Sequence, residues 1–260
     1  MPDQDGAIAT AQRMRRHHVL RLIGIGSIGL VAVAIEEAPR VESWVRTIPD
    51  FPGIPLPVLA GLSVFQPAVL LVLASWAGVR FAPRVGIKSL IAGIPTDSTT
   101  GLRRADVMIA LLVGALLAFF GVAVDSLTGG VRDANIVRHV PIRGLSAAVL
   151  YGGITEEVIF RWGLLSMLAA GMQRFTRGRS ASRPRILWIA TLITALVFGT
   201  AHLPALGEGT VFSTYVMVRT IGLNAVAGLC FGLLAWRRNL ETAMISHGFS
   251  HVVLAVLLAI

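Results

Sequence analysis

The chain has ionisable residues inside its apolar stretches, and they gather in the C-terminal half. A charged side chain at the centre of a membrane-spanning helix costs about 2.5–3.5 kcal/mol on insertion scales, so each such residue is a candidate functional residue. Carboxylates and imidazoles can move protons or bind metal ions. The residues in question are Glu156, Glu157, Arg161, His202, His247 and His251.

The spacing of the charged residues indicates which of them are neighbours. Glu157 and Arg161 are four residues apart, which places them on one helix face as an ion pair, and Glu156 then points about 100° away. The pair could take part in catalysis or simply hold helices together. Two adjacent carboxylates with one arginine leave a charge over, so one carboxylate should be protonated or paired with a metal ion or a histidine.

The histidines extend this pattern. His247 and His251 are one helical turn apart, and His202 comes from another apolar stretch. Histidines of this kind with a carboxylate can hold zinc and leave a position open for water. The HExxH motif of soluble metalloproteases is absent, as is GxSxG, which disfavours a serine protease. A single buried histidine can also be an ordinary helix contact.

Composition defines the fold class. Of 260 residues, 55% are hydrophobic and 14% are charged, and the mean hydropathy is +0.74. Soluble domains have about 45–50% apolar and about 25% charged residues. A bilayer crossing takes about 20 apolar residues, and the backbone groups inside it must be paired within a helix. The sequence therefore predicts an all-α, polytopic transmembrane helical bundle.

We expect about seven spans, and the loops between them set the orientation. Basic residues concentrate before the first span and in every second loop, and such loops face the cytoplasm. This predicts a cytoplasmic N-terminus and an external C-terminus. The net charge of +9 then reflects contact with anionic lipid headgroups, and we expect no nucleic-acid partner. The expected spans are residues 22–35, 57–79, 106–124, 145–172, 186–202, 211–236 and 242–260.

Several other features are interpreted without catalysis. Gly24, Gly26 and Gly29 match a dinucleotide-binding pattern but lie in an apolar span, so they predict helix packing, as do Gly228 and Gly232. Loops 80–105 and 125–143 could be interfacial helices or gates. The residues expected to be solvated in loops are Glu36, Glu37, Glu42, His17, His18 and His139.

Two residues of the sixth span stand apart from these motifs. Arg219 either extends its charge to the interface or marks a substrate-facing cavity. Cys230 is the single cysteine, which precludes an intramolecular disulfide.

Three motifs together resemble the CAAX-protease and bacteriocin-processing (CPBP, or Abi) family of intramembrane proteases. The resemblance covers about residues 146–251, including the apolar context Phe160-Arg161-Trp162-Gly163. It implies a helical bundle with an intramembrane cavity. The motifs are Glu156-Glu157-x-x-x-Arg161, Phe198-x-x-x-His202 and His247-x-x-x-His251.

The resemblance also implies roles for these residues. Glu156 would be the general base that activates water, and His202 its partner. His247 would complete the site, and His251 stands where the family usually has asparagine. Either these histidines or a metal ion would stabilise the oxyanion. The supporting residues would be Glu157, Arg161 and Phe198.

On this basis we expect three regions: a basic cytoplasmic segment (1–21), three N-terminal transmembrane helices with their loops (22–143), and a catalytic membrane core (144–260). The expected function is endopeptidase hydrolysis of membrane-associated proteins or peptides in a bacterial cell membrane. If zinc is the cofactor, its ligands would come from Glu156, His202, His247 and His251.

Alternatives stay open at this point. A non-catalytic immunity or scaffold protein of the same family would have the same motifs. A transporter would use the polar residues as an ion path, but no inverted repeat is visible. The expected span boundaries also place Glu156 and His202 toward the external side and His247 nearer the cytoplasm. An active site requires these three residues to converge.

Overall fold

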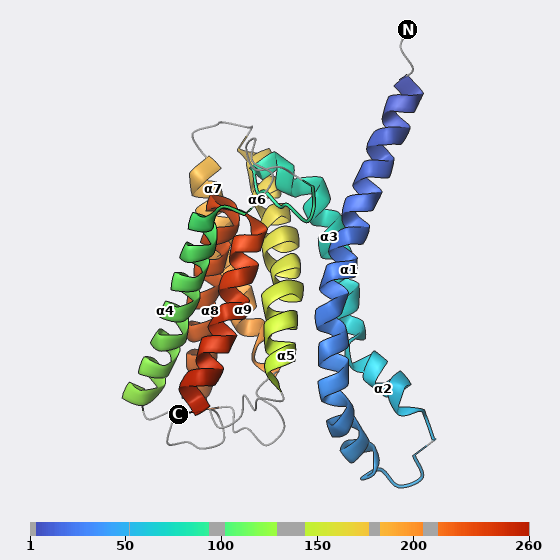
Figure 1. The fold of residues 1–260 in the computed structure, drawn as a ribbon, viewed down its shortest axis with the longest axis vertical. Coiled ribbons are helices and arrows are strands. Elements are labelled where there is room, and N and C mark those ends of the chain that lie inside the picture. Colours follow the sequence, from blue (N-terminus) through green and yellow to red (C-terminus); the bar gives the residue numbers. More distant parts are fainter. Residues whose placement is uncertain are drawn as a thin grey trace.

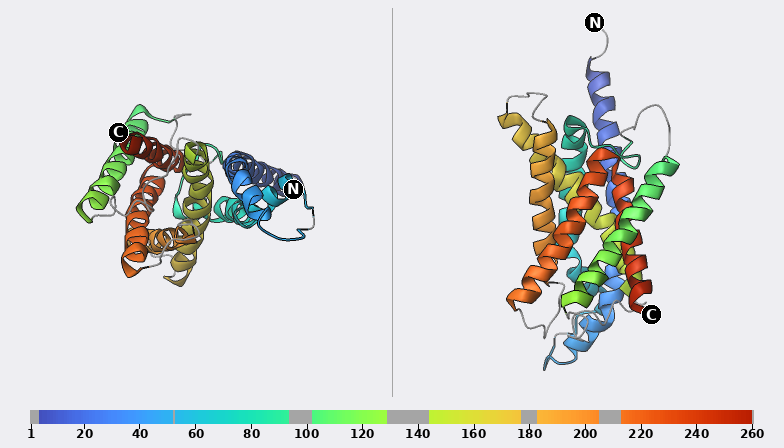
Figure 2. Two further views of the ribbon diagram at one scale, coloured as in Figure 1. Left: turned by 90° about the horizontal axis from the view of Figure 1, so that it is seen from below. Right: turned by 90° about the vertical axis from the view of Figure 1, so that its left-hand side faces the viewer.

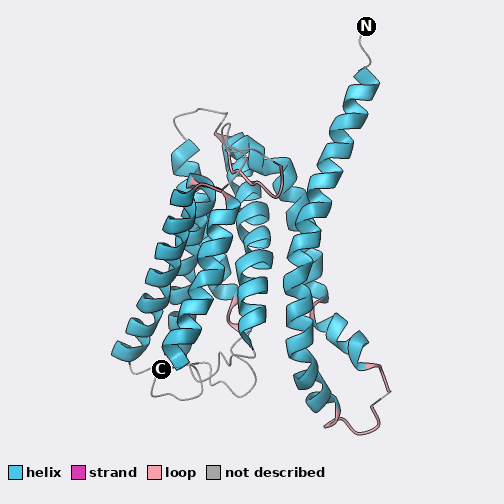
Figure 3. Ribbon diagram, viewed as in Figure 1, coloured by secondary structure: helices cyan, strands magenta, loops and turns pink. Residues whose placement is uncertain are grey.

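The structure is a computed structural model that describes residues 4–51, 53–93, 102–128, 144–176, 183–204 and 213–259. Within these ranges it consists of helices joined by turns, with no strand (Figure 3). This confirms the all-α prediction. The helices are α1 (Gln4–Val45), α2 (Leu56–Ser63), α3 (Phe65–Val85), α4 (Arg104–Thr128), α5 (Leu145–Ala147), η2 (Ala148–Glu156), η3 (Val158–Leu165), α6 (Ser166–Phe175), α7 (Arg183–Ala201), α8 (Thr214–Arg237) and α9 (Leu240–Ala259).

Six helices in the described part of the chain are long and apolar enough to cross a membrane: α4, α7, α8, α9, α3 and most of α1. The remaining expected span, 145–172, corresponds to α5, η2, η3 and α6, which follow one another from Leu145 to Phe175. Glu157 joins η2 to η3 with helical backbone angles. About seven crossings are therefore confirmed, and the protein is a multi-pass membrane protein. We refer to Leu145–Phe175 as the central helix.

The central helix is largely a π-helix, with η2 and η3 forming its middle. π-Helical hydrogen bonds join residues five apart, are rare, and occur frequently at functional sites. Both expected acidic positions lie here, because Glu156 ends η2 and Glu157 precedes η3. The α-helical geometry expected for this span is wrong in detail, although its position is correct.

The central helix lies between two groups of helices (Figures 1 and 2). On one side α1 packs against η2, and α3 packs against η3 and α6. On the other side α9 packs against η2 and α7 against η3. Helix α4 packs chiefly against α9, and α8 against α7. The division at residue 143 stays a prediction.

Glycines allow the α1 and α3 side to approach closely. A Cβ at Gly29 would collide with Thr155 and with the backbone of Tyr151, and a Cβ at Gly78 would collide with the indole of Trp162. Small residues are the usual means of close helix packing in membranes. Gly26 likewise faces α3, so the helix-packing interpretation is confirmed for Gly26 and Gly29, whereas a Cβ at Gly24 would meet nothing within 4 Å. Gly228 and Gly232 face α7 and confirm theirs.

Helix α1 extends beyond the expected span 22–35 at both ends, which corrects two predictions. His17, His18 and the three glutamates lie on the helix and not in loops, and His18 packs against Gly93. Glu36 is not simply solvated, because its Oε1 accepts hydrogen bonds from Ser146 Oγ (2.5 Å) and Ala147 N (3.2 Å). A carboxylate there satisfies the first amides of the central helix and complements its dipole.

The other two glutamates of α1 form exposed ion pairs, Glu37 with Arg40 and Glu42 with Arg46. His139 and loop residues 129–143 lie outside the described residues.

The second expected span, 57–79, is interrupted at Val64 and continues to Val85. Pro67 lies in the first turn of α3 and has no N–H to donate to the carbonyl of Ser63, so a continuous helix is disfavoured. In the loop expected at 80–105, residues 86–93 form no helix. Ser89 Oγ and Ile91 N donate to Glu241 Oε1 (2.6 and 3.0 Å), which fixes this loop to the start of α9.

The ends of the helices follow the expected alternation (Figure 1). The N-terminus of α1 and the C-terminal ends of α3 and α6 lie at one end of the bundle, and the C-terminus lies at the other. The described basic residues at these helix ends therefore share one side. That this side is cytoplasmic stays a prediction.

Candidate functional site

Glu157 is the centre of a buried polar cluster inside the bundle. Its Oε1 lies 3.1 Å from Arg161 NH1 and 2.9 Å from His247 Nδ1. Glu157 and Arg161 are almost inaccessible, with side-chain exposures of 0% and 2%. The expected ion pair is therefore present. A buried charge without its partner is strongly destabilising, so the two residues must be considered together.

Arg161 is enclosed by aromatic rings and by α8. Its guanidinium carbon lies 4.2 Å from the ring centre of Phe198 and 5.4 Å from that of Phe231. Its NH2 donates to the carbonyl of Gly228 at 3.3 Å. The cation–π contacts and the hydrogen bond compensate part of the lost hydration. Phe198, expected to support the site, thus contacts the arginine directly.

Glu156 faces two histidines. Its Oε2 lies 4.0 Å from Nε2 of His202 and 4.0 Å from Nε2 of His247. These distances exceed a direct hydrogen bond and suit groups bridged by one water. Glu156 and His202 keep side-chain exposures of 14% and 24%, so the carboxylate is not sealed off. The three residues therefore converge, despite the difference in depth that the span boundaries suggested.

The other nitrogen of each imidazole is already engaged. Nδ1 of His202 lies 2.7 Å from the carbonyl of Phe198, and Nδ1 of His247 bonds Glu157. When these nitrogens carry the proton, each Nε2 lone pair is directed to Glu156. Such partners fix both the tautomer and the ring orientation. The site is thus a carboxylate facing two preset imidazoles.

His251 joins the cluster by stacking. Its ring centre lies 5.0 Å from that of His247, at an interplanar angle of 29°. Both rings pass close to the backbone of η2, where a Cβ at Gly152 would lie 2.8 Å from Nε2 of His251 and 3.3 Å from Nε2 of His247. No hydrogen bond of His251 is found within the described ranges. Its role in place of the usual asparagine is therefore not fixed by a partner.

A cavity of about 230 Å³ reaches the two histidines of α9. Its wall includes His247, His251 and Phe231, and also Asp125 of α4 and Arg219 of α8. Arg219 donates Nε to Asp125 Oδ1 (2.6 Å) and NH2 to Oδ2 (2.5 Å). Arg219 therefore lines a cavity, as one of its two readings suggested. Asp125 was missed, although an acid in one apolar span opposite an arginine in another could have signalled the pair.

The donor atoms of the site are those that zinc prefers, but their arrangement is not that of a metal site. Within the described residues, no three His, Cys, Asp or Glu side chains lie close enough together to hold a metal ion. The expected ligand set is thus not formed by this geometry. Zinc stays a prediction.

The type II CAAX prenyl endopeptidase Rce1-like family model matches residues 139–253. Residues 139–253 are thus similar to this family. The match confirms the resemblance and contains every motif residue, whereas helices α1 to α4 lie outside it. Searches of curated proteins and of solved structures found no match.

Proposed function

We propose that the Rce1-like region is a peptidase that hydrolyses peptide bonds of membrane-associated proteins or peptides. The observation that carries the proposal is the position of Glu156, whose carboxylate faces the Nε2 atoms of His202 and His247 at 4.0 Å. A carboxylate beside preset imidazoles in a partly accessible site is suited to activate water. The family match supports the same chemistry.

In the proposed mechanism, Glu156 takes a proton from a water molecule while the water oxygen attacks the scissile carbonyl carbon. The carbonyl π electrons move to oxygen, which becomes an oxyanion. Nε2 of His247, whose Nδ1–H is held by Glu157, takes this proton from Glu156 and donates it in a hydrogen bond to that oxyanion, and His251 adds a second donor. The oxyanion electrons then re-form the carbonyl, the C–N bond breaks, and the proton passes from His247 to the leaving amine.

The decisive experiment maps peptide termini in membranes that express wild-type protein, Glu156→Gln or Glu42→Gln at equal levels. Glu42 is a matched control, because it is an exposed acid on α1 away from the site. We expect new termini with wild type and Glu42→Gln only. Identical termini in all three, with folded proteins and the native proteome present, would contradict the proposal. A non-catalytic immunity or scaffold role would then replace it.

The substrate class and location are proposals of the same kind. Because the matching family is one of prenyl endopeptidases, a prenylated CAAX peptide is the first substrate to test, beside its unprenylated form. Cleavage of both forms alike would indicate a broader membrane peptidase. We further propose the bacterial cell membrane as its location, which fractionation of the native cell tests.

A further inference from the structure

A groove lies on the outer face of the bundle between α4 and α8. It has a volume of about 570 Å³ and is lined largely by apolar side chains. Phe120, Val218 and Val226 are exposed there by 44%, 66% and 40%. On a multi-pass membrane protein such a face meets lipid chains, and it can equally take an apolar segment of another molecule.

Helices α4 and α8 have little direct contact beneath this groove, and we call the boundary between them the seam. Helix α4 packs chiefly against α9 and α8 chiefly against α7, whereas α4 and α8 touch each other much less. Two polar contacts cross the seam near the C-terminal end of α4. Arg219 binds Asp125 with two hydrogen bonds, and Tyr215 OH donates to Thr128 Oγ1 at 2.5 Å. These two polar contacts, rather than extensive packing, therefore join α4 to α8 at this end.

The groove and the inner cavity meet at the same residues. Arg219 and Leu223 line both spaces, and the inner cavity continues to His247 and His251. The Asp125–Arg219 pair therefore stands between an apolar external surface and the candidate site. The pair lies near the end of α4 and is nearly inaccessible, with side-chain exposures of 9% for Asp125 and 13% for Arg219. Burying such a pair is costly, and apolar residues would often stabilise the fold as well.

We propose that the α4–α8 groove binds the apolar segment of the substrate and that the Asp125–Arg219 pair gates its passage to His247 and His251. This inference rests on the proposed peptidase function. An apolar segment held in the groove places the polar scissile region beside Arg219. Separation of the pair then opens a lateral path from the bilayer into the site.

The gate is tested by bridging the seam. Thr128→Cys and Tyr215→Cys, with Cys230→Ser, are joined by a short bis-methanethiosulfonate crosslinker, which forms a reducible disulfide with each cysteine and releases sulfinate. A matched control joins Glu36→Cys to Ser146→Cys, a hydrogen-bonded pair away from the groove. We expect the first bridge to reduce cleavage at least tenfold (about 1.4 kcal/mol) and reduction to restore it, while the control bridge has little effect. Full cleavage with the seam bridged would overturn the gate.

The groove is tested without catalysis, which separates its failure from failure of the peptidase proposal. A photo-crosslinking residue replaces Val218 (66% exposed) or, as control, Leu73, an apolar residue of α3 with a similar exposure (58%). Both are placed in Glu156→Gln protein and illuminated with a synthetic Leu/Ala-rich transmembrane peptide. Preferential labelling from position 218 supports the groove even if wild type proves inactive. Equal labelling from both positions would overturn it.

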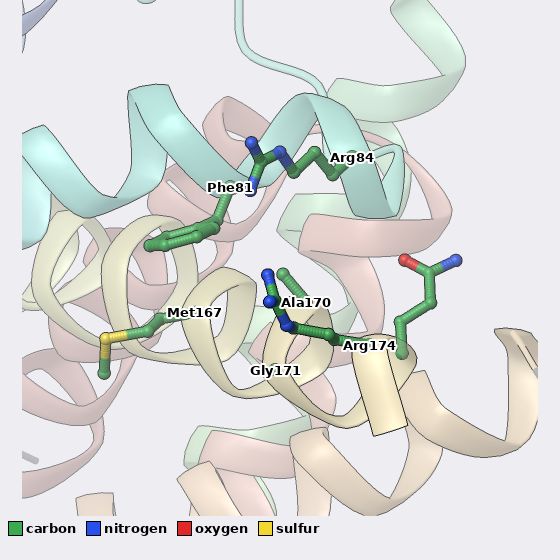
Figure 4. Close-up of a pocket in the computed structure, with 7 residues that line it drawn as sticks. Phe81, Arg84, Met167, Ala170, Gly171 and Arg174 are labelled. Carbon is green, nitrogen blue, oxygen red and sulfur yellow. The ribbon is translucent and has the colours of Figure 1, made fainter. Parts of the chain in front are cut away.

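A second inference rests on a different cavity, at the basic end of the bundle. This cavity of about 670 Å³ lies between the ends of α3 and α6 (Figure 4). Arg84 and Arg174 extend along it from opposite sides, with Phe81 and Met167 further along its apolar part. Within the described part of the chain, no carboxylate pairs with either arginine.

We infer that this cavity binds an anionic phospholipid, with the phosphate between Arg84 and Arg174 and an acyl chain against Phe81 and Met167. Arginine recognises phosphate through paired N–H groups. Basic pockets between membrane helices on the positively charged side are suited to such headgroups. The guanidinium of Arg84 lies 5.4 Å from the Phe81 ring centre, which already orients it over the apolar part.

The test compares thermal unfolding of the protein in phosphatidylglycerol and phosphatidylcholine nanodiscs. We expect phosphatidylglycerol to raise the unfolding temperature of wild type. That rise should disappear in Arg84→Gln/Arg174→Gln and persist in Arg13→Gln/Arg15→Gln, which changes charge equally on exposed α1. Equal loss in both double variants, or an equal rise caused by free inorganic phosphate in phosphatidylcholine, would overturn the lipid site.

Discussion

The two sides of the central helix are built on different principles. Toward α3 the central helix packs closely through small residues: Trp162 lies against Gly78, and Gly163 lies against Ala74. Toward α7, α8 and α9 it presents charge, with Glu157 holding both Arg161 and His247. One helix thus serves as a packed wall on one face and as a reactive surface on the other.

The two faces determine different features of the candidate site. Packing against glycine determines how closely α1 and α3 approach, but it specifies no tautomer and no proton position. The charged face specifies both, through contacts that each need a partner. Substitutions on the packed face should therefore change stability alone, whereas those on the charged face should change chemistry, and also stability where they break a buried ion pair.

The largest effect on catalysis is expected for Glu156→Gln on the charged face. We expect kcat to fall by about 10²–10⁴-fold, the usual contribution of a general base, with an unchanged unfolding temperature. Cleavage of a membrane-embedded reporter peptide by purified protein measures this. Activity equal to that of Glu42→Gln would remove Glu156 from the mechanism.

Glu157→Leu should be the most destabilising change on the charged face. It leaves Arg161 buried without its carboxylate, so the free energy of unfolding should fall by about 3–5 kcal/mol. Equilibrium unfolding in mixed micelles measures the loss. The double variant Glu157→Leu/Arg161→Leu should recover part of it, and a loss equal to the sum of both single changes would contradict a coupled pair.

Gly78→Leu probes the packed face. A side chain there meets the buried indole of Trp162, and overpacking costs about 1–3 kcal/mol of unfolding free energy. We expect kcat of the folded fraction to stay unchanged. Gly61→Leu is the control, because nothing lies within 4 Å of a Cβ at that position. A loss of kcat that is larger, as an activation free energy, than the loss of unfolding free energy would contradict the distinction between the two faces.

Thr155→Val tests the polar contact that crosses to α1. Thr155 Oγ1 donates to the carbonyl of Gly26 at 2.7 Å, and its loss should cost about 1 kcal/mol of unfolding free energy. Valine keeps the shape, so packing is preserved. Thermal unfolding in detergent is sufficient to measure it, and no change would show that Gly26 and Gly29 alone hold this contact.

His251→Asn should have the smallest effect. The ring stacks on His247, and asparagine restores a hydrogen-bond donor, so kcat should change by about threefold or less, under ~1 kcal/mol. Kinetics on the reporter peptide measure it. Loss of activity together with loss of bound zinc, by elemental analysis, would instead make His251 a metal ligand.

Much of the site could be predicted because the cost of burying charge leaves so few places for Glu156, Glu157 and Arg161 in an apolar chain. The spacing of Glu157 and Arg161 also predicted their ion pair correctly. The convergence of Glu156, His202 and His247 could not be derived, because depth depends on helix tilt and on where α9 begins. Asp125 was missed because it lies near a helix end, where an acid usually needs no explanation.

The fold shows the same limit. Alternating basic loops predicted which helix ends share a side. The π-helical turns of η2 and η3 leave no signature in apolar periodicity, and the role of Glu36 depends on a contact with Ser146, more than a hundred positions away. Local pattern specifies the elements, whereas tertiary contacts specify their irregularities.

The length of α1 makes bilayer thickness a variable of the site. Its 42 residues extend about 63 Å at 1.5 Å per residue, against a hydrocarbon core of about 30 Å. The apolar part of the helix, which follows Arg21, adjusts to a thicker or thinner bilayer by tilting. Because Gly29 and Glu36 join it to η2 and to the start of the central helix, any tilt reaches the helix that bears Glu156. We therefore expect lipid chain length to affect the geometry of the carboxylate, and with it the rate of cleavage.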